Sequence, residues 1–411
     1  MTSIAYAALW IFVFAVPWDR LVTLPGVNII SKLTGGLALG LTIFAVLFTG
    51  RVRRWRLFQI AGFLFVVWTG VGVWVMLQGR NIPLKFFTFA QLFLVVWMIW
   101  ELGLSSRRLR GLMIAYVCGS CVPAIATILL YARAGGTLRR FSAGGADANS
   151  LAMTLALALP MAWYLAMTTQ KPLARWAYRA FLPLGLLASA LTGSRGGMIA
   201  WIVALSIIPL TMVLTPGRLA AAIGLLGLSA ALVVVYVPDQ VAQRLGSTGT
   251  QVETVNFGGR FRLWLAGVHA FTRKPMMGYG VGMFRAAIEP EVGPDPNVAH
   301  NSYLSVLVEE GLVGLALYST MILSVLFSIL RLRGLERRFA LVLMATLQTA
   351  MLPLTWEDQK QVWFVTALLI GISTPLVIRQ RIALQRAEPD RAPRAPRVAA
   401  RSLQPRTLGR P

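Results

Sequence analysis

The sequence is poor in charged residues, in cysteine and in histidine. Of its 411 residues, 13% are charged and 57% are hydrophobic, against about 25% and roughly 45–50% in ordinary soluble domains. Together with a mean hydropathy of +0.68, this shortage of charge excludes a water-soluble globular protein and a disordered chain. With only two cysteines, the chain is not a disulfide-stapled secreted module either.

The two cysteines, Cys118 and Cys121, lie close together in a long apolar run. A redox pair needs an exposed thiolate in electropositive surroundings, which a membrane-spanning segment does not offer. We therefore expect both to be small residues at a contact between helices.

Apolar runs of bilayer-spanning length, roughly 17–25 residues, recur along the whole chain. They predict an all-α, polytopic membrane protein with about 12 transmembrane helices. The first run has no basic stretch before it and no small-residue cleavage site after it, so we expect a retained span and not a signal peptide. The predicted spans are residues 4–17, 30–49, 57–78, 86–101, 111–132, 150–168, 180–193, 198–214, 219–238, 302–330, 339–355 and 361–378.

Basic residues are concentrated in alternate loops between these spans. The positive-inside rule assigns the basic set of loops to the cytoplasm, and with twelve spans both termini are then cytoplasmic. The basic residues of these loops are Arg51, Arg53, Arg54, Arg56, Arg107, Arg108, Arg110, Lys171, Arg175, Arg179, Arg218, Arg331, Arg333, Arg337 and Arg338.

The formal net charge is +24, which would suggest nucleic-acid binding if the basic residues covered one surface. Their sorting into loops explains the charge without nucleic acid.

Residues 1–378 are expected to form a single transmembrane domain. Residues 379–411 carry nine arginines and two acidic residues without apolar periodicity, which predicts a disordered basic cytoplasmic tail. A solvated tail is the simpler interpretation, and association with anionic lipid is the alternative.

A minority of basic residues lies in the loops on the side opposite the cytoplasm, where the positive-inside rule does not require them. A basic residue at the membrane edge is costly enough to indicate function, although solvated loop charge is the alternative for Arg244 and Arg285. The set comprises Arg133, Arg139 and Arg140 before the sixth span, Arg195 in a glycine-rich turn, and Arg244, Arg260, Arg262, Arg273, Lys274 and Arg285 in the predicted periplasmic loop 239–301.

Loop 239–301 contains a helical pattern over residues 258–271. Apolar residues recur there at helical spacing, with Arg260 four residues before Trp264 on the same face. We expect a helix at the membrane interface, and a plain interfacial helix with snorkelling arginines is the alternative. The apolar stripe is Phe261, Trp264, Leu265, Val268 and Phe271.

The same loop continues into an alternating glycine run and ends at one of the two histidines. Gly278 to Gly282 predicts unusual dihedral angles or a close backbone approach. His300 and Asn301 open the tenth span, where free amides and the helix dipole favour anions. Neutral imidazole there can act as a general base, with a capping role as the alternative. The other histidine, His269, is expected to be structural.

No metal constellation is apparent in the sequence. The acidic residues outside the cytoplasmic loops are scattered and do not join a histidine at ligand spacing. Arginine, with its permanent charge and bidentate fork, is the natural metal-free binder of pyrophosphate. We therefore expect no metal and no cofactor.

These motifs resemble the O-antigen ligase and polymerase superfamily of bacterial inner membranes. The resemblance covers residues 139–314 in patches, and the large loop before the His-Asn span agrees with it. The matching residues are Arg140, Asp147-Ala-Asn149-Ser-Leu-Ala, Ser194-Arg195-Gly196, Arg260, Trp264, Lys274-Pro-Met-Met-Gly-Tyr-Gly-Val-Gly282, His300-Asn301, Leu304, Glu309-Glu-Gly311 and Gly314.

The resemblance implies a GT-C-like glycosyltransferase that moves a glycan from undecaprenyl pyrophosphate to an acceptor hydroxyl, without metal. The acceptor is lipid A–core for ligases, a repeat unit for polymerases and a Ser or Thr hydroxyl for protein O-oligosaccharyltransferases. Because only a short basic tail follows the last span, ligase is preferred and polymerase comes second. The expected partners are the glycan donor, lipid A–core and membrane lipids, at a periplasmic active site.

The resemblance also implies roles for the outer residues. His300 would be the catalytic base, and Arg195 and Arg260 would neutralise the charge on the leaving pyrophosphate. The expected substrate-binding residues are Arg139, Arg140, Arg262, Asn149, Asn301 and Glu309. For Asn301, capping of the helix is an equally good role. Glu309 is expected to pair with an arginine.

Two other classes compete with a transferase. A transporter of lipid-linked sugars would show internal repeats and polar residues near the middle of the membrane, and we find no repeat. A structural scaffold of the envelope predicts that the outer arginines are dispensable.

Overall fold

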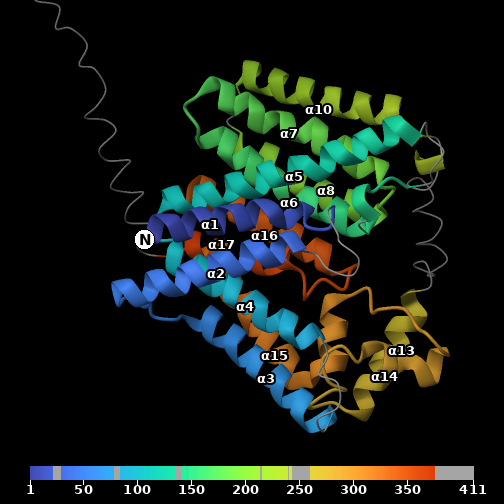
Figure 1. The fold of residues 1–411 in the computed structure, drawn as a ribbon. Helices are drawn as coiled ribbons and strands as arrows, with labels where there is room; N and C mark the ends of the chain where they lie inside the picture. The colour runs from blue at the N-terminus through green and yellow to red at the C-terminus, as the bar shows by residue number, and fades with distance from the viewer. Residues whose placement is uncertain are drawn as a thin grey trace, which may run out of the picture.

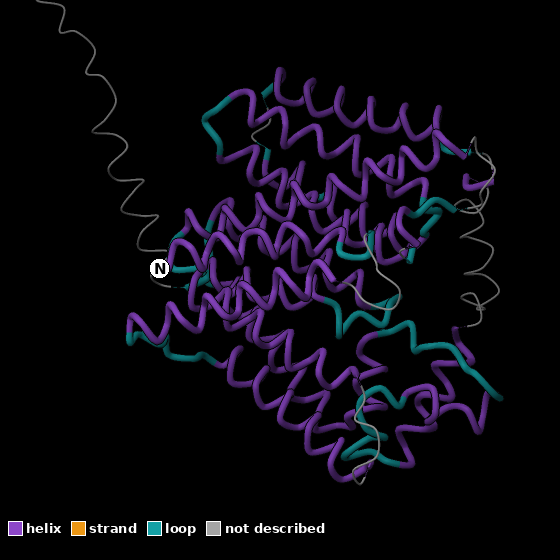
Figure 2. The backbone as a smooth tube through the Cα atoms, in the orientation of Figure 1, coloured by secondary structure: helices purple, strands orange, loops and turns teal. Residues whose placement is uncertain are grey.

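The computed structural model describes residues 1–21, 29–77, 84–134, 140–145, 147–212, 215–238, 240–242 and 260–374. Within these ranges all regular elements are helices and no strand occurs, as Figure 2 shows. Predictions that fall outside them concern Arg139, Arg244 and the tail 379–411.

Helices that run lengthwise through the molecule form one bundle (Figure 1). They are α1 (Thr2–Ala15), α2 (Ile29–Thr49), α3 (Leu57–Leu77), α4 (Leu84–Leu102), α5 (Ser106–Ala134), α6 (Ala148–Thr168), α7 (Pro172–Leu191), α8 (Arg195–Leu205), α9 (Ile207–Thr211), α10 (Pro216–Tyr236), α15 (Ser302–Leu330), α16 (Gly334–Met351) and α17 (Lys360–Ile372). Shorter elements connect them: η1 (Val16–Trp18), η2 (Ala143–Gly145), α13 (Arg260–Arg273) and α14 (Phe284–Val292).

Each of the twelve predicted spans overlaps a helix of the bundle, and the eighth is divided between α8 and α9. Among the described residues, seven helices are long and apolar enough to cross a membrane, namely α2, α3, α4, α5, α6, α10 and α15. Three shorter apolar stretches cover Thr2–Trp18, Arg195–Thr211 and Lys360–Ile372. The structure therefore supports a polytopic membrane protein, while the number of twelve spans and the GT-C-like architecture stay predictions.

Loops that are rich in arginine meet at one end of the bundle. There the guanidinium groups donate hydrogen bonds to the last carbonyls of helices: Arg108 to Leu102 of α4 (3.0 Å) and Arg338 to Leu210 of α9 (3.0 Å). Such contacts satisfy carbonyls without a helical partner and complement the helix dipole. We call this end, with the loops at 50–56, 103–105, 169–171 and 331–333, the arginine end.

Helices α13 and α14 lie at the opposite end from the N-terminus (Figure 1). We call this the α13 end; it includes residues 140–145, 147, 192–194, 260–301 and 352–359. The two helices bury a small apolar cluster of their own against α15, formed by Ala266, Ala270, Phe284, Ala287, Ile288, Ala299 and Val308. On α13 the stripe residues Phe261, Leu265 and Val268 stay exposed, and the position of this helix at the membrane interface stays a prediction.

Helix α6 lies at the centre of the bundle, and α10 lies at its edge. Every residue from Leu151 to Ala166 is buried, whereas 11% of the α10 span is buried and its apolar side chains face outward. An exposed apolar helix suits a lipid environment, in which the backbone must satisfy its own hydrogen bonds. Close packing around α6 depends on small residues: a Cβ at Gly197 of α8 would lie 2.4 Å from the Ala152 Cβ.

This packing predicts that Gly197→Val lowers the stability of the bundle, because over-packing costs about 1–3 kcal/mol. The control is Gly224→Val in α10, where an added Cβ has no neighbour within 4 Å. Thermal unfolding of the purified variants in detergent should show a lower Tm for Gly197→Val alone. Equal Tm values would contradict the close α6–α8 contact.

Candidate functional site

The long helix α15 is interrupted at Gly311, and the loop that precedes α14 fills the interruption. Gly311 has φ 66° and ψ −167°, so the carbonyls before it lose their helical partners. The Val308 carbonyl accepts a hydrogen bond from the amide of Tyr279 (3.0 Å), and the Glu309 carbonyl accepts one from Gly280 (2.8 Å). The loop thus replaces the helical bonds that the break removes.

This contact requires glycine on both sides. Gly278 has φ +69°, and a Cβ there would lie 2.4 Å from the Glu309 carbonyl oxygen. A Cβ at Gly311 would lie 2.3 Å from the carbonyl oxygen of Met276. The close backbone approach predicted from the alternating glycines is therefore confirmed.

The side chain of Glu309 also contacts the loop that precedes α14, through its carboxylate. It accepts a hydrogen bond from the Gly282 amide (2.8 Å) and forms an ion pair with Lys85 of α4 (2.8 Å). The expectation that Glu309 pairs with an arginine is therefore wrong: its partner is a lysine that the sequence analysis did not single out. The sequence does carry a signal for this residue, because Lys85 is the one basic residue in the apolar stretch 84–102.

Lys85 also forms an ion pair with Glu357 (2.7 Å), which lies in the loop between α16 and α17 and is fully buried. One ammonium group therefore joins α4, α15 and the loop 352–359. Burial raises the pKa of Glu357, while Lys85 acts in the opposite direction. Removing the lysine would leave two buried carboxylates facing each other without a cation.

The loop 352–359 in turn holds the segment that contains His300. The Thr355 hydroxyl accepts a hydrogen bond from the His300 amide (2.9 Å), and the Ser302 hydroxyl donates to the Leu354 carbonyl (2.9 Å). His300 has φ +49°, in the left-handed region that non-glycine residues seldom adopt. Such a conformation persists where surrounding contacts determine it, as they do here.

Asn301 caps α15. Its side-chain oxygen accepts a hydrogen bond from the Leu304 amide (3.0 Å), which satisfies one free amide of the first turn. Of the two roles that the sequence left open, the structure thus shows the capping role. This cap also explains why the helix begins directly after Asn301.

Arg260, the first residue of α13, acts electrostatically on His300. Burial lowers the pKa of His300, the positive charge of Arg260 lowers it further, and Asp147 acts in the opposite direction. Burial also lowers the pKa of Arg260, again opposed by Asp147. The imidazole is therefore neutral at pH 7, the state that a general base needs.

A second group of predicted residues surrounds the start of α6. The guanidinium of Arg140 donates to the Thr192 carbonyl (2.9 Å) and to the Asn149 side-chain oxygen (2.8 Å). The Ser194 hydroxyl donates to the same oxygen of Asn149 (3.0 Å) and caps α8, whose first residue is Arg195. The structure therefore brings Arg140, Asn149 and the Arg195 turn together.

The two groups are connected through the N-terminus of α6. Asp147 caps this helix by accepting from the Ser150 amide (2.8 Å), and its charge reaches both Arg260 and His300. The Ser150 hydroxyl accepts from the indole of Trp356 (3.1 Å) in the loop 352–359. Asp147, Thr355 and Glu357 had no assigned role in the sequence analysis.

Arg262 and Arg139 are not placed in this cluster. Arg262 is exposed on α13 and donates to the Val292 carbonyl at the end of α14 (3.4 Å), while Arg139 lies outside the described residues. Among the described residues no group of three or more His, Cys, Asp or Glu side chains is arranged to hold a metal ion. We call the group formed by Arg140, Asp147, Asn149, Arg195, Arg260 and His300 the polar site.

Taken together, the apolar helical bundle and the polar site define a polytopic membrane protein with a polar site at the α13 end. A sequence model of the O-antigen ligase family matches residues 180–319. This stretch contains Arg195, Arg260, His300 and the break in α15, and its sequence is similar to that family. A search of curated proteins finds no match.

The double ion pair predicts that Lys85→Met destabilises the protein by about 3–5 kcal/mol, the cost of leaving buried charge without its partner. Thermal unfolding should show a large drop in Tm for this variant. The exposed Lys171 at the arginine end supplies the control Lys171→Met. The triple variant Lys85→Met/Glu309→Gln/Glu357→Gln removes all three charges and should recover part of the loss. Wild-type stability of Lys85→Met would contradict the assigned role.

Proposed function

We propose that the protein is an O-antigen ligase of the bacterial inner membrane. It transfers an O-antigen glycan from undecaprenyl pyrophosphate to a sugar hydroxyl of lipid A–core. The observation that carries the proposal is the half-buried His300, which lies within the stretch that matches the family and whose pKa is lowered by burial and by the positive charge of Arg260. The positive-inside rule supports a cytoplasmic arginine end and a periplasmic α13 end.

The proposed reaction is a direct displacement at the anomeric carbon with inversion. The acceptor oxygen forms a bond to that carbon while its proton passes to the neutral imidazole of His300. The bond between the carbon and the pyrophosphate oxygen breaks, and undecaprenyl pyrophosphate leaves with the bonding electrons. His300 then gives its proton to solvent, which restores the starting state.

Arginine side chains stabilise the leaving group in this proposal. Charge builds on the pyrophosphate as the bond breaks, so a fixed guanidinium group favours the transition state more than the ground state. The positive charge of Arg260 acts on His300. Arg140 binds Asn149 at the start of α6 and Thr192 in the turn that leads to Arg195, the first residue of α8. Arg262, Asn149 and Arg139 stay predicted contacts to the glycan or pyrophosphate.

Glycosyl transfer by purified protein tests the proposal. The protein is incubated with undecaprenyl-pyrophosphate glycan and with lipid A–core, carrier-linked repeat or pilin as separate acceptors. Glycosylation of lipid A–core supports the ligase, whereas the other two products would identify a polymerase or a protein transferase. Movement of the donor across a proteoliposome membrane without transfer would instead indicate a transporter.

Removal of the base should abolish most of this activity. His300→Ala is expected to lower kcat by roughly 10²–10⁴-fold, the usual contribution of a positioned general base. His269→Ala is the matched control, because His269 pairs with Glu291 on the surface of α13 (2.7 Å). Undiminished transfer by His300→Ala would rule out the base.

The pH dependence of the reaction separates the roles of Arg260 and Arg262, which both lie in the first turn of α13. Since burial and Arg260 lower the His300 pKa below its usual 6.5, kcat/KM should fall only at acid pH, where His300 becomes protonated. Arg260→Gln removes the charge, so the His300 pKa and the acid limb should move to higher pH. The rate should also fall by roughly 10²–10³-fold.

Arg262→Gln, two residues away, should leave the position of the acid limb unchanged. The profile is measured as kcat/KM between pH 4.5 and 8.5, conditions chosen to bracket the reference pKa of histidine, about 6.5. An acid limb that does not move in Arg260→Gln would contradict the electrostatic coupling. Loss of activity with EDTA, restored by Mg²⁺, would contradict the metal-free mechanism.

A further inference from the structure

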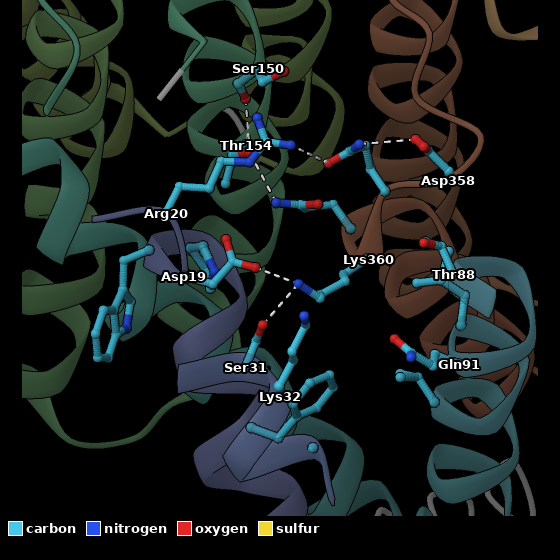
Figure 3. Close-up of a pocket in the computed structure, with 18 of the residues that line it drawn as sticks. Asp19, Arg20, Ser31, Lys32, Thr88, Gln91, Ser150, Thr154, Asp358 and Lys360 are labelled. Carbon is cyan, nitrogen blue, oxygen red and sulfur yellow. Dashed lines mark hydrogen bonds and ion pairs between the residues drawn. The ribbon is translucent and has the colours of Figure 1, made fainter. Parts of the chain in front are cut away.

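A cavity of about 610 Å³ lies beside the polar site, between α1, α2, α4, α6 and the start of α17 (Figure 3). None of Arg140, Arg195, Arg260 and His300 lines it. Its volume falls within the usual range of small-molecule sites, about 300–1,000 Å³. The cavity shares Ser150 and Trp356 with the walls of the polar site, so the two are neighbours without being the same site.

The wall of the cavity changes from polar to apolar with depth. At the α13 end it carries Lys32 of α2, Thr88 of α4 and Lys360 of α17, whereas deeper positions carry Leu39 and Met98. With a helical rise of about 1.5 Å per residue, Thr88 and Met98 are separated by roughly 15 Å along α4. This gradient fits a molecule with a polar head and a hydrocarbon chain.

Cations outnumber acids around the mouth of the cavity. Lys360 forms an ion pair with Asp19 and a hydrogen bond to the Ser31 hydroxyl (2.9 Å), so its charge is balanced. Arg20 donates to the neutral side-chain oxygen of Gln359 (3.1 Å). Lys32 has no hydrogen-bond or ion-pair partner within the described part of the chain, and Figure 3 shows it beside Ser31 and Lys360.

Lys32 and Arg20 thus face the cavity without a carboxylate partner, and the remaining acid, Asp358, accepts from the Gln359 amide (2.9 Å). A basic residue in the first turn of a span is costly unless an anion or water compensates its charge. Phosphate oxygens accept hydrogen bonds from ammonium and guanidinium groups. The mouth of the cavity is therefore suited to an anionic head.

Helix α2 leaves room for a chain next to this mouth. Gly36 lines the cavity, and an added Cβ there would have no neighbour within 4 Å. Four residues further along the helix, Gly40 also has open space around it but does not line the cavity. The two glycines form a matched pair: filling one narrows the cavity, and filling the other does not.

We propose that this cavity binds a phosphate group carried on a long hydrocarbon chain, with the phosphate at Lys32 and Arg20 and the chain along Leu39 and Met98. It is a lipid-anion site separate from the arginine and histidine cluster. Two lipids share this chemistry, a polyprenyl phosphate and a bulk membrane phospholipid. The proposal concerns binding alone and does not require glycosyl transfer.

Binding of a radiolabelled polyprenyl monophosphate to the detergent-purified full-length protein tests the proposal. Lys32→Gln removes the ammonium group that would bind the phosphate, and Gly36→Leu narrows the cavity. Each variant should raise the Kd about tenfold. The controls Lys171→Gln and Gly40→Leu should leave the Kd within twofold of the wild-type value. The thermal unfolding midpoint of each variant shows whether the fold is retained.

Competition identifies the source of the lipid. Displacement by unlabelled polyprenyl phosphate alone assigns the cavity to the carrier lipid, and equal displacement by phosphatidylglycerol assigns it to membrane phospholipid. Displacement by inorganic pyrophosphate as effective as that by the lipids would overturn the proposal, because the chain would then contribute nothing. The absence of saturable binding, or equal Kd values for Gly36→Leu and Gly40→Leu, would overturn it as well.

Discussion

The ammonium group of Lys85, enclosed between the carboxylates of Glu309 and Glu357, is the contact on which the geometry of the α13 end depends. Charges removed from water are tolerated only when each has a partner, so these three side chains constrain one another's positions. Through them α4, α15 and the loop 352–359 meet at one point. The loop then anchors the His300 amide through Thr355, and Glu309 anchors the glycine loop.

The break in α15 shows how the same end combines rigidity with an irregular backbone. A membrane-spanning helix cannot leave its carbonyls without partners in hydrocarbon. At Gly311 the amides of Tyr279 and Gly280 supply those partners, so the break is satisfied by the loop that leads into α14. Because this loop follows α13 directly, its docking also positions Arg260 at the start of α13 relative to His300 at the start of α15.

Sequence patterns were informative where the chemistry is local, and less so where the partners are distant. The helices, the sorted arginines, the glycine loop, the position of His300 and the grouping of Arg140 with Asn149 follow from hydropathy, spacing and motif. Lys85 and Glu357 are separated by 272 residues, and no periodicity connects two side chains at that distance. The same limit led to an arginine partner for Glu309. The cavity was likewise not predicted, since its walls come from segments that are far apart in the chain.

The scarcity of acidic residues leaves basic side chains at the α13 end without a neutralising carboxylate. Most of the acids described there are already bound to a nearby group. Asp147 caps α6, and the others form ion pairs: Asp19 with Lys360, Glu291 with His269 and Arg273, and Glu309 and Glu357 with Lys85. Carboxylates committed in this way cannot neutralise Arg20, Lys32 or the full charge of Arg260. Positive potential therefore persists at the α13 end, where burial strengthens it. A site built from such uncompensated cations favours a ligand that brings its own negative charge, and a lipid-linked phosphate does so while its chain remains in the bilayer.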